Sequence, residues 1–161
     1  MAGDELQAEL TPTLLDRLMD RNPQSSREEA GSVWEHAREL QSALCRDLAA
    51  LLNTRRASED FDGRYEEAGN SLLSFGITDF TAHNLKKGVQ QEQLRKSIEQ
   101  SIRRFEPRLD HVDVTLQESE AGRPVLRFQV SAVLRTRNQD AVFFEATLHR
   151  DSRRFGVSGG A

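Results

Sequence analysis

Apolar residues recur at helical spacing through the first third of the chain. Between positions 33 and 51 they return every three or four residues, at Val33, Ala37, Leu40, Leu44, Leu48 and Leu51. This spacing predicts a long helix with one apolar stripe facing a core. Ser26 and Glu29 have the spacing of a capping box at its start, and Asn53 is expected to end it.

A second helix is predicted further along the chain, from about Val89 to Phe105. Its apolar residues share one face, with Leu94, Ile98 and Ile102 at spacings of four. Pro107 is expected to stop it, because proline lacks a backbone N–H and disfavours helical geometry in the residue before it.

The last third of the chain alternates apolar and polar residues with a period of two. The alternating runs are Val112–Leu116, Leu126–Leu134 and Val142–Leu148, and Phe155 with Val157 suggests a short fourth strand. Short, turn-rich connections at 119–124 and 136–140 are typical of antiparallel hairpins with one buried face. The predicted fold class is therefore α+β, with helices packed on one face of a three- to four-stranded antiparallel sheet.

The expected domain organisation is simple. Residues 1–25 form an N-terminal arm, residues 26–157 form a single α+β domain, and residues 158–161 form a flexible tail. The arm contains a short apolar patch at Leu14, Leu15, Leu18 and Met19. A segment this short cannot hold a helix in isolation, so we expect it to dock on its own domain or on a partner.

Charge and cysteine content narrow the function classes. Residues 1–70 carry 15 acidic and 8 basic residues, and residues 71–161 carry 11 acidic and 14 basic residues, an excess too weak to predict nucleic-acid binding. The single cysteine, Cys45, excludes an internal disulfide and fits a reducing compartment. With neither a signal peptide nor an apolar run of membrane-spanning length, the protein is predicted to be cytoplasmic, without direct membrane insertion.

The sequence predicts no catalytic, cofactor or metal site. The four histidines are scattered, and Cys45 has no partner at ligand spacing. No phosphate-binding glycine loop, dinucleotide fingerprint or nucleophile elbow is present. Because none of the eleven Asp residues has a Glu nine positions earlier, the carboxylate pair typical of phage-type lysozymes is missing too. We therefore expect a protein that is not an enzyme.

The most distinctive local pattern is Glu106-Pro107-Arg108. Proline fixes the backbone between two opposite charges, at the point where a helix gives way to a strand. Two interpretations are equally good on chemical grounds. The two charged groups project from a rigid corner toward a partner, or they form an intramolecular salt bridge beside a helix stop.

Several segments together carry a resemblance to a known family. Leu48–Arg56 and Phe105–Leu109, with Leu14–Leu18, Ser71–Gly76 and Arg154–Phe155, occur in the expected order over nearly the whole chain. The sequence resembles the TssE family, small baseplate subunits of bacterial type VI secretion systems. That family belongs to the phage baseplate wedge proteins, which have also been called "lysozyme-like".

The resemblance implies a non-enzymatic, structural role. It implies that Glu106 and Arg108 contact the wedge proteins TssF and TssG, with Pro107 as a rigid spacer and Arg55 and Arg56 as further interface residues. It also implies that a sheet edge pairs with the TssB/TssC sheath by strand addition and helps to initiate its assembly, and that other baseplate components such as TssK are possible partners. A phage tail or other contractile injection system is the alternative setting, and a peptidoglycan hydrolase is the alternative from a different class.

Overall fold

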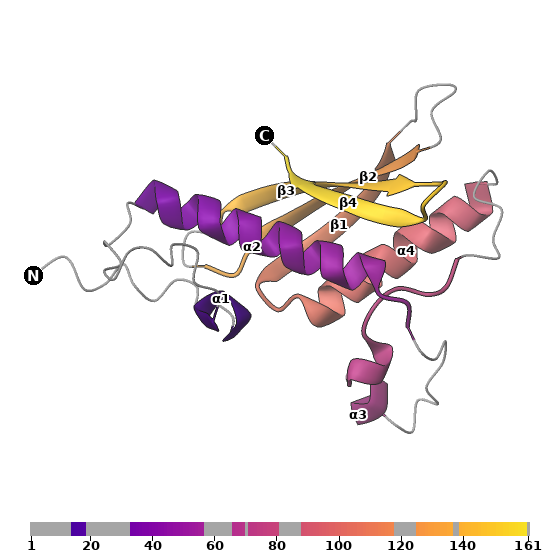
Figure 1. Ribbon diagram of the computed structural model, residues 1–161, viewed down its shortest axis with the longest axis horizontal. Helices are drawn as coiled ribbons and strands as arrows, with labels where there is room; N and C mark the ends of the chain where they lie inside the picture. Colours follow the sequence, from indigo (N-terminus) through magenta and orange to yellow (C-terminus); the bar gives the residue numbers. More distant parts are fainter. Residues whose placement is uncertain are drawn as a thin grey trace, which may run out of the picture.

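The computed structural model describes residues 14–18, 33–56, 66–69, 71–80, 88–117, 125–136 and 139–160 (Figure 1). Its helices are α1 (Leu14–Leu18), α2 (Val33–Asn53), α3 (Glu66–Gly69), a 3₁₀ helix η1 (Leu72–Ser74) and α4 (Gly88–Phe105). Its strands are β1 (Leu109–Gln117), β2 (Val125–Leu134), β3 (Ala141–His149) and β4 (Arg154–Gly159). Of the predicted capping box, Ser26 and Glu29 lie outside the described residues.

The four strands form one antiparallel meander in the order β1-β2-β3-β4. Val130 of β2 lies opposite Val114 of β1 and Phe144 of β3, so the apolar residues of the three strands line up on one face. The predicted hairpins are confirmed. Strand β4 continues to Gly159, two residues beyond the predicted Val157, and pairs with β3 over that length.

Helices α2 and α4 lie on the same side of the sheet, α2 along β4 and α4 along β1 (Figure 1). The stripes predicted from the sequence face that sheet: α2 buries Leu44, Leu48, Leu51 and Leu52, and α4 buries Leu94, Ile98 and Ile102. They meet the inward strand residues in one core whose largest members are Phe128 and Phe144. The predicted α+β class, with helices on one sheet face, is confirmed.

The short segments that lie outside α2, α4 and the sheet differ in how far they are buried. Ile77 and Phe80, which follow η1, are buried in the core. In α1, by contrast, Leu14, Leu15 and Leu18 are all exposed. The proposed division into an arm, one domain and a tail stays a prediction. No helix among the described residues is long and apolar enough to cross a membrane.

Candidate protein-binding surface

A tight turn at residues 105–109, called the corner below, connects α4 to β1. The last helical hydrogen bond runs from the N–H of Glu106 to the carbonyl of Ile102, at 2.9 Å. The N–H of Leu109 then donates to the carbonyl of Glu106, at 3.2 Å, and β1 begins. Pro107 stands exposed at the tip. The predicted helix stop is confirmed, and Glu106 is held in the backbone turn through both its N–H and its carbonyl.

The two charged residues of the corner are paired within the fold. The Glu106 side chain is buried, with the residue only 5% exposed, and its Oε1 and Oε2 accept from Nε and Nη2 of Arg108 at 2.7 and 2.6 Å. The same Nη2 donates to Asp47 Oδ2 on α2 at 2.7 Å. The hydrogen bond with Glu106 is the largest cause that raises the pKa of Arg108; burial opposes it, and Asp47 adds to it. The intramolecular salt bridge, one of the two interpretations of the sequence, is present.

An apolar groove opens beside this corner. It has a volume of about 400 Å³ and is lined by Asp47, Leu48, Ala50, Leu51, Phe75, Phe105, Glu106, Pro107 and Arg108. Phe75 and Phe105 meet edge to face across 5.3 Å between ring centroids. Leu72, in the 3₁₀ helix just before Phe75, is 86% exposed. The groove therefore combines apolar walls, an exposed proline and a charged cluster that is already paired.

Residues 53–56, the end of the Leu48–Arg56 segment of the family resemblance, connect the end of α2 to the segment around Ile77. The N–H of Ile77 donates to the carbonyl of Thr54 and the N–H of Arg56 donates to the carbonyl of Ile77, both at 3.0 Å, which makes a short parallel bridge. Gly76 has φ of +107°, and a Cβ there would lie 2.4 Å from the Thr54 carbonyl oxygen. Only glycine fits this position, so two segments of the family signature are explained by their contact with each other.

Arg55 and Arg56 make their contacts within the chain. The Arg55 guanidinium lies 4.2 Å from the centroid of the Phe80 ring and donates to the carbonyl of Arg153 at 3.1 Å. Burial is the main cause that lowers the pKa of Arg55. Arg56 Nη2 donates to Thr78 Oγ1 at 2.8 Å. Their predicted role as interface residues stays a prediction.

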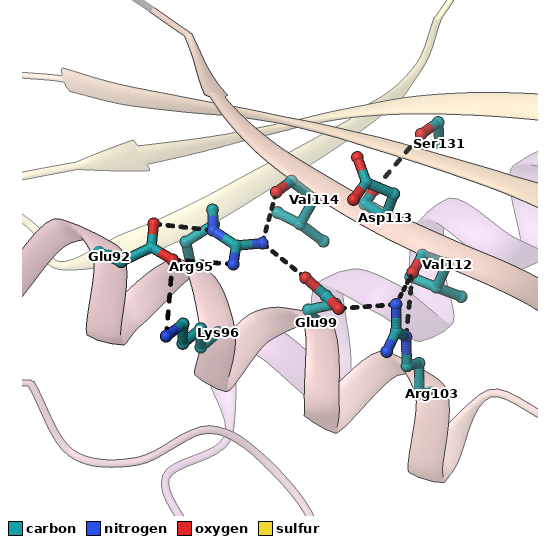
Figure 2. Close-up of polar contacts among 9 residues, drawn as sticks. All are labelled: Glu92, Arg95, Lys96, Glu99, Arg103, Val112, Asp113, Val114 and Ser131. Carbon is teal, nitrogen blue, oxygen red and sulfur yellow. Dashed lines mark hydrogen bonds and ion pairs between the residues drawn. The ribbon is translucent and has the colours of Figure 1, made fainter.

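The outer edge of β1 is covered by arginines of α4 (Figure 2). Arg95 Nη1 donates to the carbonyl of Val114 at 2.8 Å. Arg103 donates to the carbonyl of Val112 through Nε at 3.0 Å and Nη2 at 2.6 Å. Glu99 lies between the two arginines and pairs with both. Two successive outward carbonyls of this edge strand are thereby occupied.

The neutral side-chain amide of Asn53, on α2, meets the outer edge of β4. Asn53 Nδ2 donates to the carbonyl of Phe155 and Asn53 Oδ1 accepts from its N–H, both at 2.9 Å. At the other end of the strand, the Gln41 amide lies against Gly159, where a Cβ would be 2.3 Å from Gln41 Nε2. Asn53 therefore acts as a one-residue substitute for a neighbouring strand.

Residues 38–139 match the family model described as baseplate wedge protein gp25. The chain belongs to the baseplate wedge gp25 family. A solved chain described as "The baseplate complex from the type VI secretion system" has the same fold, with a TM-score of 0.52 and 21% sequence identity, over 76% of this chain and 98% of that chain. No protein with a curated description matches the chain. The sequence resemblance is thus confirmed at the level of the family, which consists of structural baseplate proteins.

Among the residues that the structure describes, no group of three or more His, Cys, Asp or Glu side chains is placed to hold a metal ion. The carboxylate of Glu106 is engaged by Arg108, which donates hydrogen bonds to both of its oxygens.

Sequence reasoning missed Asp47, Arg95 and Arg103. Asp47 reaches Arg108 only because α2 and α4 pack side by side, which no local pattern reveals. The spacing of Arg95, Glu99 and Arg103, four residues apart with alternating sign, was a visible signal for ion pairs along one helix face. What it did not show is that the guanidinium groups continue to the strand edge.

Proposed function

We propose that this chain is a structural subunit of a type VI secretion baseplate that works through protein–protein contacts and has no enzymatic activity. The observation that carries the proposal is the family match over residues 38–139, which includes both walls of the groove. The likeness in fold to a chain of a type VI secretion baseplate supports that machine as the setting. The closest alternative setting is the baseplate of a phage tail or another contractile injection system, in which the same contacts would operate.

The proposed docking surface for TssF and TssG is the groove beside the corner. Glu106 and Arg108 hold its end in a fixed shape by pairing with each other and with Asp47. Pro107 is exposed at the rim, and apolar side chains such as Phe75 and Phe105 form the wall. Apolar anchors in a preformed groove supply most of the affinity in interfaces of this kind. Glu106, Pro107 and Arg108 thus serve docking, the two charged residues mainly by positioning.

The proposed contact with the TssB/TssC sheath is strand addition at the β4 edge. The β1 edge is occupied by charged guanidinium groups, and charge-assisted hydrogen bonds are roughly twice as strong as neutral ones. The β4 edge is met by the neutral amide of Asn53, which an incoming strand displaces more easily. Arg55 holds the start of this strand through the carbonyl of Arg153 and so shapes the same edge. TssK is a further possible contact, and nucleic acid is not a proposed partner.

A capture experiment tests the docking surface. Ala50 is exposed on α2 and lines the groove, so Ala50→Arg fills the groove with a charged side chain while leaving the core untouched. Ser42→Arg is the matched control, because Ser42 is exposed on the same helix but does not line the groove. Tagged wild type, Ala50→Arg and Ser42→Arg are recovered from native cells, and the co-purifying proteins are identified by mass spectrometry.

Three outcomes are informative. If wild type and Ser42→Arg recover TssF and TssG and Ala50→Arg does not, the groove is the docking surface. If all three recover them, the baseplate role stands and docking lies elsewhere. If none does, the proposed function is wrong. Release of muropeptides from peptidoglycan by the purified protein, abolished by Glu106→Gln, would instead establish the hydrolase.

A further inference from the structure

An edge strand with bare backbone groups is a template for pairing with another chain. Strand β1 has the properties of such a template: it is nine residues long and alternates apolar Val112, Val114 and Leu116 with polar residues. Strand β1 stands at the end of the strand order β1-β2-β3-β4, so it has a strand neighbour on one side and an edge on the other. The carbonyls of Val112 and Val114 accept hydrogen bonds from side chains of α4 at this edge, where an incoming strand would have to meet them.

These carbonyls accept hydrogen bonds from Arg95 and Arg103 of α4, which form one row along the helix. Ion pairs with glutamates of the same helix hold both arginines in place. Arg95 pairs with a glutamate on either side of it along the helix (Figure 2). Its Nε and Nη2 donate to Glu92 at 2.9 Å each, and its Nη1 pairs with Glu99. Glu99 also holds Arg103, with 2.7 Å between Arg103 Nη2 and Glu99 Oε1. The hydrogen bonds that Arg95 donates to Glu92, and then to Glu99, raise the pKa of Arg95, so it stays charged at any ordinary pH.

The geometry of this row is unfavourable to strand pairing in two ways. Displacing it breaks three guanidinium–carbonyl hydrogen bonds, one from Arg95 and two from Arg103. It also leaves Glu99, whose side chain is only 15% exposed, without the cations that compensate its burial. A strand that adds to β1 would have to offset both losses before it gained any backbone pairing.

We propose that Arg95, Glu99 and Arg103 form an edge cap that prevents β1 of one copy from pairing with β1 of a second copy. A second copy is the expected occupant of an uncapped edge because antiparallel β1–β1 pairing is self-complementary: a two-fold axis places the same residues on both sides. The cap keeps the free chain from associating with itself. This inference does not depend on the proposed baseplate role.

The test removes both caps in the full chain with Arg95→Ala/Arg103→Ala. The matched control is Lys96→Ala/Arg135→Ala, which removes the same charge from two ion pairs that do not reach a β1 carbonyl. Sedimentation velocity over a wide concentration range measures the mass, and amide hydrogen exchange measures protection along β1. Circular dichroism and exchange of the core amides establish that each variant is folded.

We expect wild type and the control to stay at the mass of one chain. The uncapped variant should shift toward the mass of two chains as concentration rises, with growing protection of the Val112, Val114 and Leu116 amides. An uncapped variant that is folded and stays monomeric at every concentration overturns the proposal, and so does a control that dimerises equally. If the double variant does not fold, Arg103→Ala decides by the same criteria, since this side chain is 56% exposed and covers the Val112 carbonyl alone.

Discussion

Replacing Glu106 by glutamine tests whether the corner is held by its buried ion pair. Glu106→Gln keeps the shape of the side chain and the oxygen that faces Arg108 Nε. It replaces the second oxygen, 2.6 Å from Arg108 Nη2, by an NH₂ group, so two donors face each other. Arg108 retains Asp47 as its remaining carboxylate partner.

The expected loss follows from these contacts. Losing a charge-assisted hydrogen bond costs about 1.5–3 kcal/mol, and removing one partner of a buried pair costs about 3–5 kcal/mol. In the variant, Asp47 still compensates the charge of Arg108, whose side chain keeps some exposure to solvent. We therefore expect Glu106→Gln to lower the free energy of unfolding by about 2–4 kcal/mol relative to wild type. For a chain of this size, that corresponds to a fall in Tm of about 5–15 °C.

Urea and thermal unfolding followed by circular dichroism measure this loss, and Asp110→Asn provides the control. Asp110 makes a similar contact, 2.6 Å from Oδ1 to Arg135 Nη2, but both side chains are exposed. An ion pair between exposed side chains contributes little to stability because solvent screens it, so Asp110→Asn should change the free energy of unfolding little. If Glu106→Gln were no more destabilising than Asp110→Asn, the buried pair would not hold the corner, and Glu106 would be available to a partner after all.

Two further predictions concern other positions. Gly76→Ala should lower the free energy of unfolding by more than about 2 kcal/mol, because it combines positive φ with a Cβ pressed on the Thr54 carbonyl; Gly156→Ala, with open space around its Cβ, should be near neutral in the same urea titration. The hydrogen bond from Arg135 lowers the pKa of Asp110, so the pair stabilises the fold above the ordinary carboxyl pKa and loses that effect as pH falls through the lowered pKa. Arg135→Ala should raise the pKa of Asp110 toward its ordinary value in an NMR titration, and an unchanged pKa would contradict this cause.

The elements of the fold follow from periodicity because burial imposes it. The predicted second helix differs from α4 by one residue, Gly88 against Val89, and three of the predicted strands match within a few residues. The first strand was expected to begin at Val112 but begins at Leu109. A bulge near His111, whose φ is +51°, shifts the alternation there, so a strict period of two does not extend through it.

The site was less predictable, because its decisive contacts are between distant residues. From the sequence, docking and internal pairing were equally good interpretations of Glu106 and Arg108. Asp47, which completes the cluster, precedes them by about sixty residues and comes from another helix. The position of Arg55 over Phe80 is likewise set by how the chain folds back after residue 56. Local patterns show which residues are charged, but the partner of each charge depends on packing.

The structure also shows what some segments of the family resemblance do within the fold. Two of the segments that carry the family resemblance make contacts that hold the fold together: residues 53–56 tie α2 to Ile77 and to β4, and residues 106–108 tie the end of α4 to Asp47 on α2. A residue that the fold needs for its own contacts need not touch a partner. The residues that line the groove therefore have two roles. The buried charges fix its shape, and exposed neighbours such as Ala50 and Pro107 are available for contact. On this view, variants of the exposed rim should weaken assembly while stability is kept, whereas variants of the buried charges should weaken assembly only as far as they loosen the corner.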